Sequence, residues 1–428
     1  MTRRPTFSAG ARSPDVAATA AARPFGRPAD APTRGPWLTR AALGLAVAVV
    51  IARLFMTESI RSAIPVEPGG TAIPYGPGPA AGLLLDLLAG LCPLLVLVRR
   101  WVDPAYALRL AWSPLAFAVL AAWAVVSTAW AGDRFAALVS SCHLLAAAGV
   151  LWAVAQIVRT PAHARLLAGV CVGLLGVLLA HGLWYQLVDR ADLRHAWETN
   201  RDELLKARNV RPGTFEYTQF ENKILRGELM GFSASPNTYA AAIVLLGLVV
   251  LGATAQFVRD RRWASAATML AVLAVAAGVL PLAQSRTGDI TAALGAAAVG
   301  AAAVFAPTFR RRSTLLYVAG ALGVAAVAAF VVGYGLSRGT LFHDSLNFRW
   351  RYWVGSFQLW KLHPLAGVGW ENFGPHYLGV RMPEATEEIK DPHNYLVRFA
   401  AELGGVGGLL ALAWTARAWW EITRPGPE

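Results

Sequence analysis

The sequence predicts an all-α, polytopic membrane protein. Of its 428 residues, 56% are apolar and only 15% are charged, whereas soluble domains carry roughly 25% charged residues. Apolar runs of about 20 residues recur along the chain, and each could cross a hydrocarbon core of roughly 30 Å. Inside lipid every backbone amide needs a partner within its own segment, so these runs are expected to be helices. The alternating pattern of a membrane β-barrel does not occur in the sequence.

The apolar runs predict about ten transmembrane helices with two long hydrophilic loops between them. The expected spans cover residues 37–55, 80–98, 107–127, 135–158, 165–187, 238–257, 263–283, 287–306, 314–335 and 394–414.

Arginine in the short connections predicts the orientation of these spans. The clusters Arg99–Arg100, Arg259–Arg262 and Arg310–Arg312 fall on alternate connections. We therefore expect this side, with both termini, to be cytoplasmic, and the two long loops to lie on the outer face. The net charge of +13 follows largely from these arginines and the N-terminal tail, so no nucleic-acid partner is expected.

The chain then divides into segments of different character. The expected division is a disordered cytoplasmic tail (1–36), N-terminal transmembrane helices (37–187), a periplasmic loop (188–237), transmembrane helices with the Arg286 turn (238–335), a periplasmic loop with an interfacial helix (336–393), a last transmembrane helix (394–414) and a cytoplasmic tail (415–428).

Motifs for soluble nucleotide chemistry or a zinc site are not found in the sequence. The three cysteines lie within predicted spans and show no metal-binding spacing. We expect neither a metal nor a cofactor. Four groups of residues remain, and all fall on the predicted outer face.

The first group is "GFSASPNTYAA", at the start of a predicted span. Pro236 suits the first turn of a helix. Asn237 could bind a substrate hydroxyl, although a helix cap is the plainer interpretation.

The second group is "QSRTGD", a very short turn between two apolar spans. A cation such as Arg286 near bilayer depth costs several kcal/mol unless it reaches water or an anion. The alternatives are that Arg286 extends to lipid headgroups or pairs with Asp289.

The third group is "NFRWRYWVGSFQLWKLHPLAGVGWENF", which predicts an interfacial helix ended by Pro364. Its aromatic residues suit the lipid–water boundary. Arg349 and Arg351 are two residues apart and point in different directions on a helix, so only one is expected to face a site. An aromatic anchor without catalysis is the alternative.

The fourth group is "DPHNYLVRFAAELGGVGG", where a loop becomes the last span. His393 is expected at the helix start, with Asn394, Arg398 and Glu402 along one face. Arg398 and Glu402 are four residues apart and can form an ion pair, which is the plainer role for Glu402. The glycines that follow permit close helix packing.

Together these motifs resemble the bacterial O-antigen ligase / O-antigen polymerase superfamily over about residues 230–410. The matching positions are Pro236-Asn237, Ser285-Arg286, Arg349 with Trp353, His363-Pro364-Leu365 with Gly367-Val368-Gly369, and His393-Asn394 with Leu396 and Glu402.

The resemblance implies a multi-pass glycosyltransferase of the bacterial inner membrane, working at the periplasmic face in lipopolysaccharide or polysaccharide biosynthesis. Its donor would be a glycan on a polyprenyl (undecaprenyl) diphosphate and its acceptor a lipid A-core sugar or another glycan. Guanidinium groups suit the charge of the leaving diphosphate, and an imidazole can act as a base near neutral pH.

The expected roles follow from the resemblance together with this chemistry. Arg286 and Arg349 bind the diphosphate, with Arg351 as the alternative to Arg349. His393 deprotonates or orients the acceptor hydroxyl, and the reaction inverts the anomeric carbon without a metal. The residues expected to hold substrate are Arg351, Asn237, Asn394 and Glu402.

Two alternatives remain open. A polymerase of the same superfamily would differ from a ligase only in its acceptor. A transporter of lipid-linked glycans would require charges near the bilayer midplane, where the only candidate is Asp86.

Overall fold

The computed structural model describes residues 34–55, 79–207, 210–229, 231–233, 235–385 and 389–423. The expected N-terminal tail lies outside these ranges except for residues 34–36. Within the described ranges all regular secondary structure is helical, and ten helices are long and apolar enough to cross a membrane. The prediction of an all-α polytopic membrane protein with about ten spans is confirmed.

The ten long helices are α1 (Pro36–Phe55), α2 (Pro79–Val102), α3 (Trp112–Val126), α4 (Arg134–Ile157), α5 (Pro161–Trp184), α8 (Pro236–Arg259), α9 (Trp263–Val279), α10 (Arg286–Val304), α12 (Ser313–Arg338) and α15 (Tyr395–Thr423).

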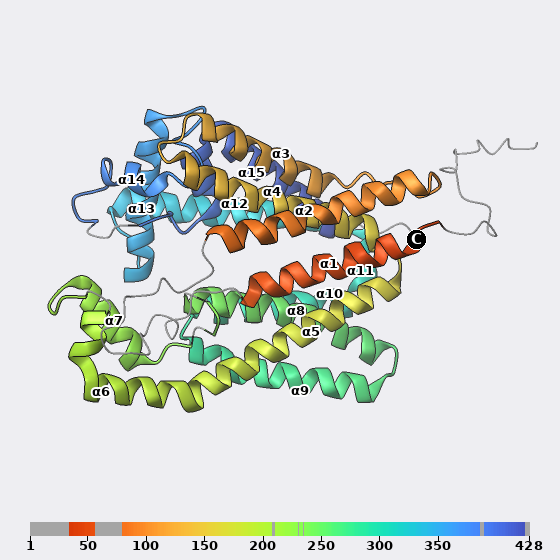
Figure 1. Cartoon of the computed structure of the whole chain (residues 1–428), viewed down its shortest axis with the longest axis horizontal. Helices are drawn as coiled ribbons and strands as arrows, with labels where there is room; N and C mark the ends of the chain where they lie inside the picture. The colour runs from red at the N-terminus through yellow and green to blue at the C-terminus, as the bar shows by residue number, and fades with distance from the viewer. Residues whose placement is uncertain are drawn as a thin grey trace, which may run out of the picture.

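The long helices form two packed groups (Figure 1). In the first group α2 packs on α1 and α4, and α3 packs on α4 and α15. In the second group α8 packs on α5, α9 and α10. Its core is continuous and apolar, with Tyr239, Leu175 and Ala240 fully buried. Contacts between α1 and α4 bring the first helix of the chain into the first group.

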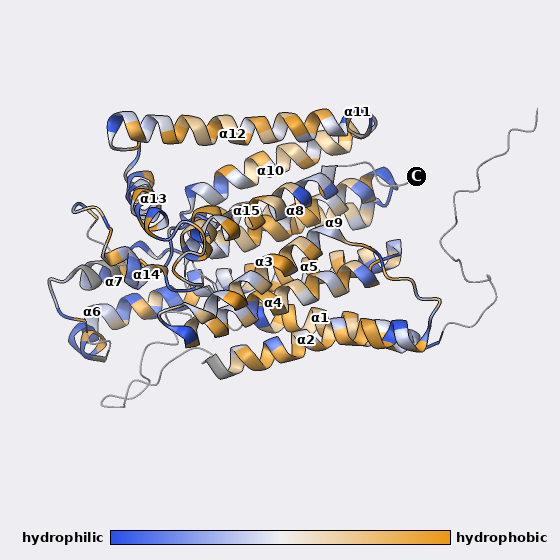
Figure 2. Ribbon diagram, turned by 90° about the horizontal axis from the view of Figure 1, so that it is seen from above, coloured by the Kyte–Doolittle hydropathy of each residue, from blue (hydrophilic) through white to orange (hydrophobic). Residues whose placement is uncertain are grey.

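Shorter helices gather at one end of the bundle, which we call the loop end (Figure 1). They are α6 (Arg190–Ala207), α7 (Phe215–Arg226), α13 (Asp344–Leu362) and α14 (Phe373–Leu378). The opposite end of the bundle contains the C-terminal ends of α2 and α15 and the short helix α11 (Ala306–Arg311). Polar residues are frequent in the loop-end helices, whereas the long helices are mainly apolar (Figure 2).

The first part of the predicted loop 188–237 is helical and continues α5. A π-helical turn at Tyr185–Asp189 joins α5 directly to α6, and the joined helix extends from Pro161 to Lys206 over 46 residues. A kink at Asn200 interrupts this helix, and the part before the kink is about 58 Å long at 1.5 Å per residue, about twice a hydrocarbon core. Its second half therefore extends beyond the bilayer, where α6 packs on α7 around Trp197.

Local sequence explains where the helices of the site begin. Ser235 caps α8, and its hydroxyl accepts a hydrogen bond from the backbone N–H of Asn237. Ser285 caps α10 in the same way and accepts from the N–H of Gly288. A serine cap satisfies one of the free N–H groups at a helix start. Gly288 also lets the two helices approach, because a Cβ there would lie 2.8 Å from the Cβ of Ala240.

The last long helix, α15, is broken at Gly404, where φ is 69° and ψ is −169°. The segment 364–369 fills the break. The N–H of Gly405 donates to Pro364 O at 2.7 Å, and the N–H of Gly369 donates to Glu402 O at 2.8 Å. The indole N–H of Trp123 donates to Leu403 O. The glycines of this span were expected to allow close packing between helices. At Gly404 the close contact is instead with the backbone of Leu365 and Ala366.

Candidate active site

Helix α13 connects the residues that the sequence groups predict as a site. Just before its first residue, His343 Nε2 lies 2.5 Å from Arg286 Nη1. Since a guanidinium can only donate, the imidazole nitrogen is the acceptor. Ten residues later, Trp353 Nε1 donates to the carbonyl of Pro392 at 3.1 Å. The distance along the helix between these contacts is about 15 Å, so α13 brings the Arg286 turn and the His393 loop to neighbouring positions.

A cavity of about 260 Å³ lies where α8, α10 and α13 meet. Its polar side includes Asn237, Ser285, Thr287 and Arg349. Its apolar side is formed by Ala241, Val244, Leu245 and Leu248, all on α8.

The capped ends of α8 and α10 point their first turns at this cavity. Ser285 Oγ donates to Asn237 Oδ1 at 2.7 Å, which ties the two helix starts together. Helix N-termini carry a partial positive charge and free N–H groups, and they favour anions. Arg286 is the first residue of α10 and is exposed. The cavity therefore combines cationic and N–H donors with an apolar wall.

The two arginines of α13 have different surroundings. Arg349 lines the cavity, whereas Arg351 Nη1 donates to the backbone carbonyl of Glu384 at 2.8 Å. The guanidinium of Arg351 also lies 5.9 Å from the Phe348 ring. Of the two, the structure brings Arg349 next to Asn237 and the start of α10.

His393 lies on the same face of α13 as Arg349. Its ring contacts Tyr352 edge-on, with centroids 5.9 Å apart. Tyr352 and Arg349 are three residues apart, a spacing that places them on one helix face. His393 is about half exposed and adopts a left-handed φ of 54°. His393 therefore contacts α13 at Tyr352, about one helical turn along the helix from Arg349.

Asp391 was not predicted from the sequence as a site residue, and it holds His393. Its Oδ1 accepts the backbone N–H of His393 at 2.7 Å and lies 3.3 Å from Nδ1 of the ring. These hydrogen bonds from His393 lower the pKa of Asp391 to about 2, so the carboxylate is ionised at neutral pH. The signal was present in "DPHN", where an acid precedes the histidine by two residues.

Asn394 and Glu402 have structural partners of their own. Asn394 Oδ1 accepts from the N–H groups of Leu396 and Val397 at 3.0 and 3.3 Å, so Asn394 caps α15. Glu402 is fully buried and accepts from the N–H of Glu371 at 2.8 Å.

The ion pair predicted between Arg398 and Glu402 is present, with 3.3 Å between Nε and Oε1. Arg398 also pairs with Glu371 through Nη2 and lies 4.5 Å from the centre of the Trp370 ring. Glu402 therefore lies within a buried network beneath the loop 364–372, not among the residues that line the cavity.

Asp86, the acid predicted within a span, is paired. It contacts both Arg53 and His143, on two neighbouring helices, as expected for an acid that bonds to adjacent helices.

Comparisons with known proteins agree with the resemblance. Residues 271–412 match the O-Antigen ligase family. This region includes Arg286, α13, the His393 loop and the broken helix, while α8 and the helices before it lie outside. Searches of curated proteins and of solved structures give no match. The match over residues 271–412 supports the O-antigen ligase/polymerase superfamily for this part of the chain, which lies within a multi-pass helical membrane protein.

Proposed function

We propose that this protein is an O-antigen ligase-type glycosyltransferase. It would move a glycan from a polyprenyl diphosphate to an acceptor hydroxyl, a lipid A-core sugar, at the periplasmic face of the bacterial inner membrane. The family match supports a membrane glycosyltransferase of the ligase/polymerase type. The donor, the acceptor and the residue roles below are our proposal.

The observation that carries the proposal is the composition of the 260 Å³ cavity. A polyprenyl diphosphate has an anionic head and an apolar tail. Arg349 and the two helix starts suit the head, because guanidinium groups form bidentate contacts with phosphate. The wall of Ala241, Val244 and Leu248 on α8 suits the first part of the tail. Arg286, held by His343, adds a second cation beside the same helix start.

In the proposed reaction, the oxygen of the acceptor hydroxyl attacks the anomeric carbon. The bond between this carbon and the diphosphate oxygen breaks, and its electron pair leaves with the diphosphate. Arg286 and Arg349 stabilise the negative charge that develops there. His393 takes the hydroxyl proton, and since Nδ1 faces Asp391, the acceptor nitrogen is Nε2. Attack opposite the leaving group inverts the anomeric configuration.

The remaining predicted residues take supporting roles in this proposal. Asn237 shares its Oδ1 with Ser285, and its amide N–H groups would donate to the phosphate or the sugar. Asn394 would position His393 by capping α15. Arg351 would hold the 381–385 segment against α13, and Glu402 would hold the loop 364–372.

The test is glycan transfer by purified protein in detergent, where transport across a membrane has no meaning. Arg349→Ala should lower the rate at least about 100-fold, the scale expected for removal of one donor to a developing charge. Arg351→Ala is the matched control from the same helix and should retain activity within about threefold. His393→Ala should also abolish transfer. Full activity of Arg349→Ala would remove this arginine from the mechanism.

The acceptor needs a separate experiment. A deletion strain should accumulate full-length glycan on the lipid carrier if the protein is a ligase, measured by mass spectrometry of membrane glycans. Accumulation of single repeat units would show a polymerase instead. Absence of turnover by the purified wild-type protein would favour transport.

A further inference from the structure

The C-terminal end of α7 lies beside the turn that leads into Arg286. The backbone N–H of Leu229 donates to Leu282 O at 3.1 Å. The side-chain Nε2 of Gln284 donates to Arg226 O, also at 3.1 Å. Leu229 is fully buried in the core of the second helix group, so the contact is anchored at one end. Its other end is Gln284, two residues before Arg286, and it joins the α6–α7 hairpin to the proposed donor site.

Gln284 has a backbone conformation that is uncommon for its residue type. Its φ of 53° and ψ of 29° lie in the left-handed region, where glycine and asparagine are the usual residues. The residue ends the 3-10 turn Leu280–Ala283, and its N–H donates to Pro281 O at 3.0 Å. A glycine would adopt this conformation with less strain, whereas glutamine adds a side chain that reaches Arg226 O. A strained residue beside a site supports a functional hypothesis.

The side chain of Gln284 is exposed, and this determines what its hydrogen bond can do. A solvent-accessible hydrogen bond between uncharged groups adds little to global stability, because water competes for both partners. The bond still selects one arrangement of the short turn between α9 and α10. Its loss is therefore expected to loosen the turn without unfolding the protein.

The residues after Gln284 form part of the polar side of the 260 Å³ cavity. Ser285 caps α10 and donates to Asn237 Oδ1 at 2.7 Å, and Thr287 lines the cavity. The free N–H groups of this first turn, together with Arg286, are the donors proposed to hold the diphosphate. A displacement of about 1 Å in such groups can cost about 100-fold in rate. A contact that fixes the backbone at position 284 therefore acts on all of these donors together.

We propose that Gln284 is a positioning residue for the diphosphate donor, because its hydrogen bond to Arg226 O ties the first turn of α10 to the α6–α7 hairpin. Its role differs from that of His343, which contacts the guanidinium of Arg286. Gln284 holds the backbone from which that side chain starts. This inference rests on the proposed function, since it takes the start of α10 as the place of the diphosphate.

Two variants separate this role from that of an ordinary turn residue. Gln284→Gly keeps the left-handed backbone and relieves its strain but removes the side chain. Gln284→Met keeps the length of the side chain without its N–H groups. Both should lower kcat/KM for the lipid-linked donor at least about fivefold, the effect of one hydrogen bond between uncharged groups, and leave KM for the acceptor unchanged. The melting temperature of Gln284→Gly should stay within about 3 °C of the wild type, because relief of strain offsets the lost bond.

Arg261→Gly is the matched control, since Arg261 also has a left-handed φ, of 55°, and lies in the connection between α8 and α9. It should leave kcat/KM for the donor within about twofold, as expected for a surface substitution away from the site. If Gln284→Gly transfers glycan as fast as the wild type, Gln284 serves only as a turn residue and the proposal is wrong. A melting temperature that falls in parallel with the rate would assign Gln284 to the stability of the fold and would also contradict the proposal.

Hydrogen–deuterium exchange of the full-length protein gives a readout that does not depend on glycan transfer. The N–H groups of Gly288 and Asp289 bond to Ser285, so the peptide over residues 285–289 reports on the order of this turn. It should exchange at least about threefold faster in Gln284→Met than in the wild type. The start of α5, capped in the same way by Thr160, is the control and should not change.

The two experiments distinguish failure of this inference from failure of the proposed function. Unchanged exchange over residues 285–289 in Gln284→Met would overturn the tie to the hairpin, whatever the rate of transfer. If the wild-type protein transfers no glycan while the exchange result holds, the proposed function fails and the tie between Gln284 and the hairpin stands.

Discussion

Gly404→Ala is the substitution whose effect can be derived most directly from the structure. The residue has φ 69° and ψ −169°, a region that is essentially restricted to glycine and costs other residues about 1–3 kcal/mol. A Cβ there would also lie 2.1 Å from Leu365 O and 2.5 Å from the N of Ala366. Both contacts are with backbone, so no side-chain rotation relieves them.

The hydrogen bonds across the break add to this cost. If the segment 364–369 moves away, the bonds of Gly405 N to Pro364 O and of Gly369 N to Glu402 O are weakened. Each contributes about 1 kcal/mol net. The expected total is about 3–5 kcal/mol lower free energy of unfolding.

The assay is denaturant unfolding in detergent, supported by the melting temperature. Gly252→Ala is the matched control, because this glycine lies within α8 and a Cβ would meet nothing within 4 Å. Alanine at a helical position of this kind is expected to stabilise by up to about 1 kcal/mol. The two substitutions should therefore act in opposite directions. A Gly404→Ala protein as stable as Gly252→Ala would refute the role assigned to the helix break.

Three further predictions concern the site and its support. Below about pH 4 the wild type should lose stability relative to Asp391→Asn. The pKa of Asp391 is lowered from 3.8 to about 2 on folding, so the stability that the ionised carboxylate contributes is lost as pH falls through this interval. Urea unfolding between pH 2 and 7 measures this loss. In transfer assays at neutral pH, Asp391→Asn should lower the rate, because the carboxylate that lies 3.3 Å from Nδ1 and holds the His393 ring is lost; an unchanged rate would separate Asp391 from the chemistry. Glu402→Ala should lower the free energy of unfolding by about 3 kcal/mol, as expected when one partner of a buried ion pair is removed. Glu402→Gln keeps an acceptor for the Glu371 N–H and should cost less when measured by the same urea unfolding.

The transmembrane helices were predictable because their signal is local. Apolar length determines a span wherever it lies in the chain, and the ten predicted spans are confirmed by ten helices. The break in α15 was not predictable in this way. In the sequence Gly404 is one of several glycines in an apolar run, and each is compatible with a packed helix. Its conformation depends on the segment 364–369, more than 30 residues earlier in the chain.

The residues of the candidate site could be named from the sequence, but their arrangement could not. Spacing alone shows that Arg349 and Arg351 point in different directions. Only the packing of α13 shows that Arg349 lines the cavity at the start of α8, whereas Arg351 contacts Glu384 O. The same limit applies to Asn394. An asparagine beside a histidine suggests a ligand contact, whereas the structure uses its side chain to cap α15. The same side-chain oxygen can cap a helix or contact a ligand, so the sequence alone does not separate these two roles.

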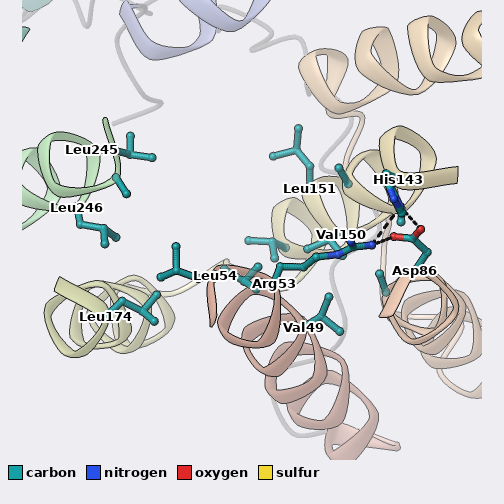
Figure 3. A pocket seen from close by; sticks show the side chains of 16 residues that line it. Val49, Arg53, Leu54, Asp86, His143, Val150, Leu151, Leu174, Leu245 and Leu246 are labelled. Carbon is teal, nitrogen blue, oxygen red and sulfur yellow. Dashed lines mark hydrogen bonds and ion pairs between the residues drawn. The ribbon is translucent and has the colours of Figure 1, made fainter. Parts of the chain in front are cut away.

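Arg53 lines an apolar cavity between α1, α4, α5 and α8 (Figure 3), and its partner differs from that of Arg286. Arg53 contacts a carboxylate, which cancels its charge. The contact of Arg286 is an imidazole nitrogen, which orients the guanidinium without cancelling its charge. In the part of the chain that the structure describes, Arg286 forms no salt bridge, and such a cation beside a helix start favours an anion. Leu245 of α8 lines both this cavity and the cavity at the start of α10, so a change of packing in the first would move the wall along which the donor tail is proposed to bind.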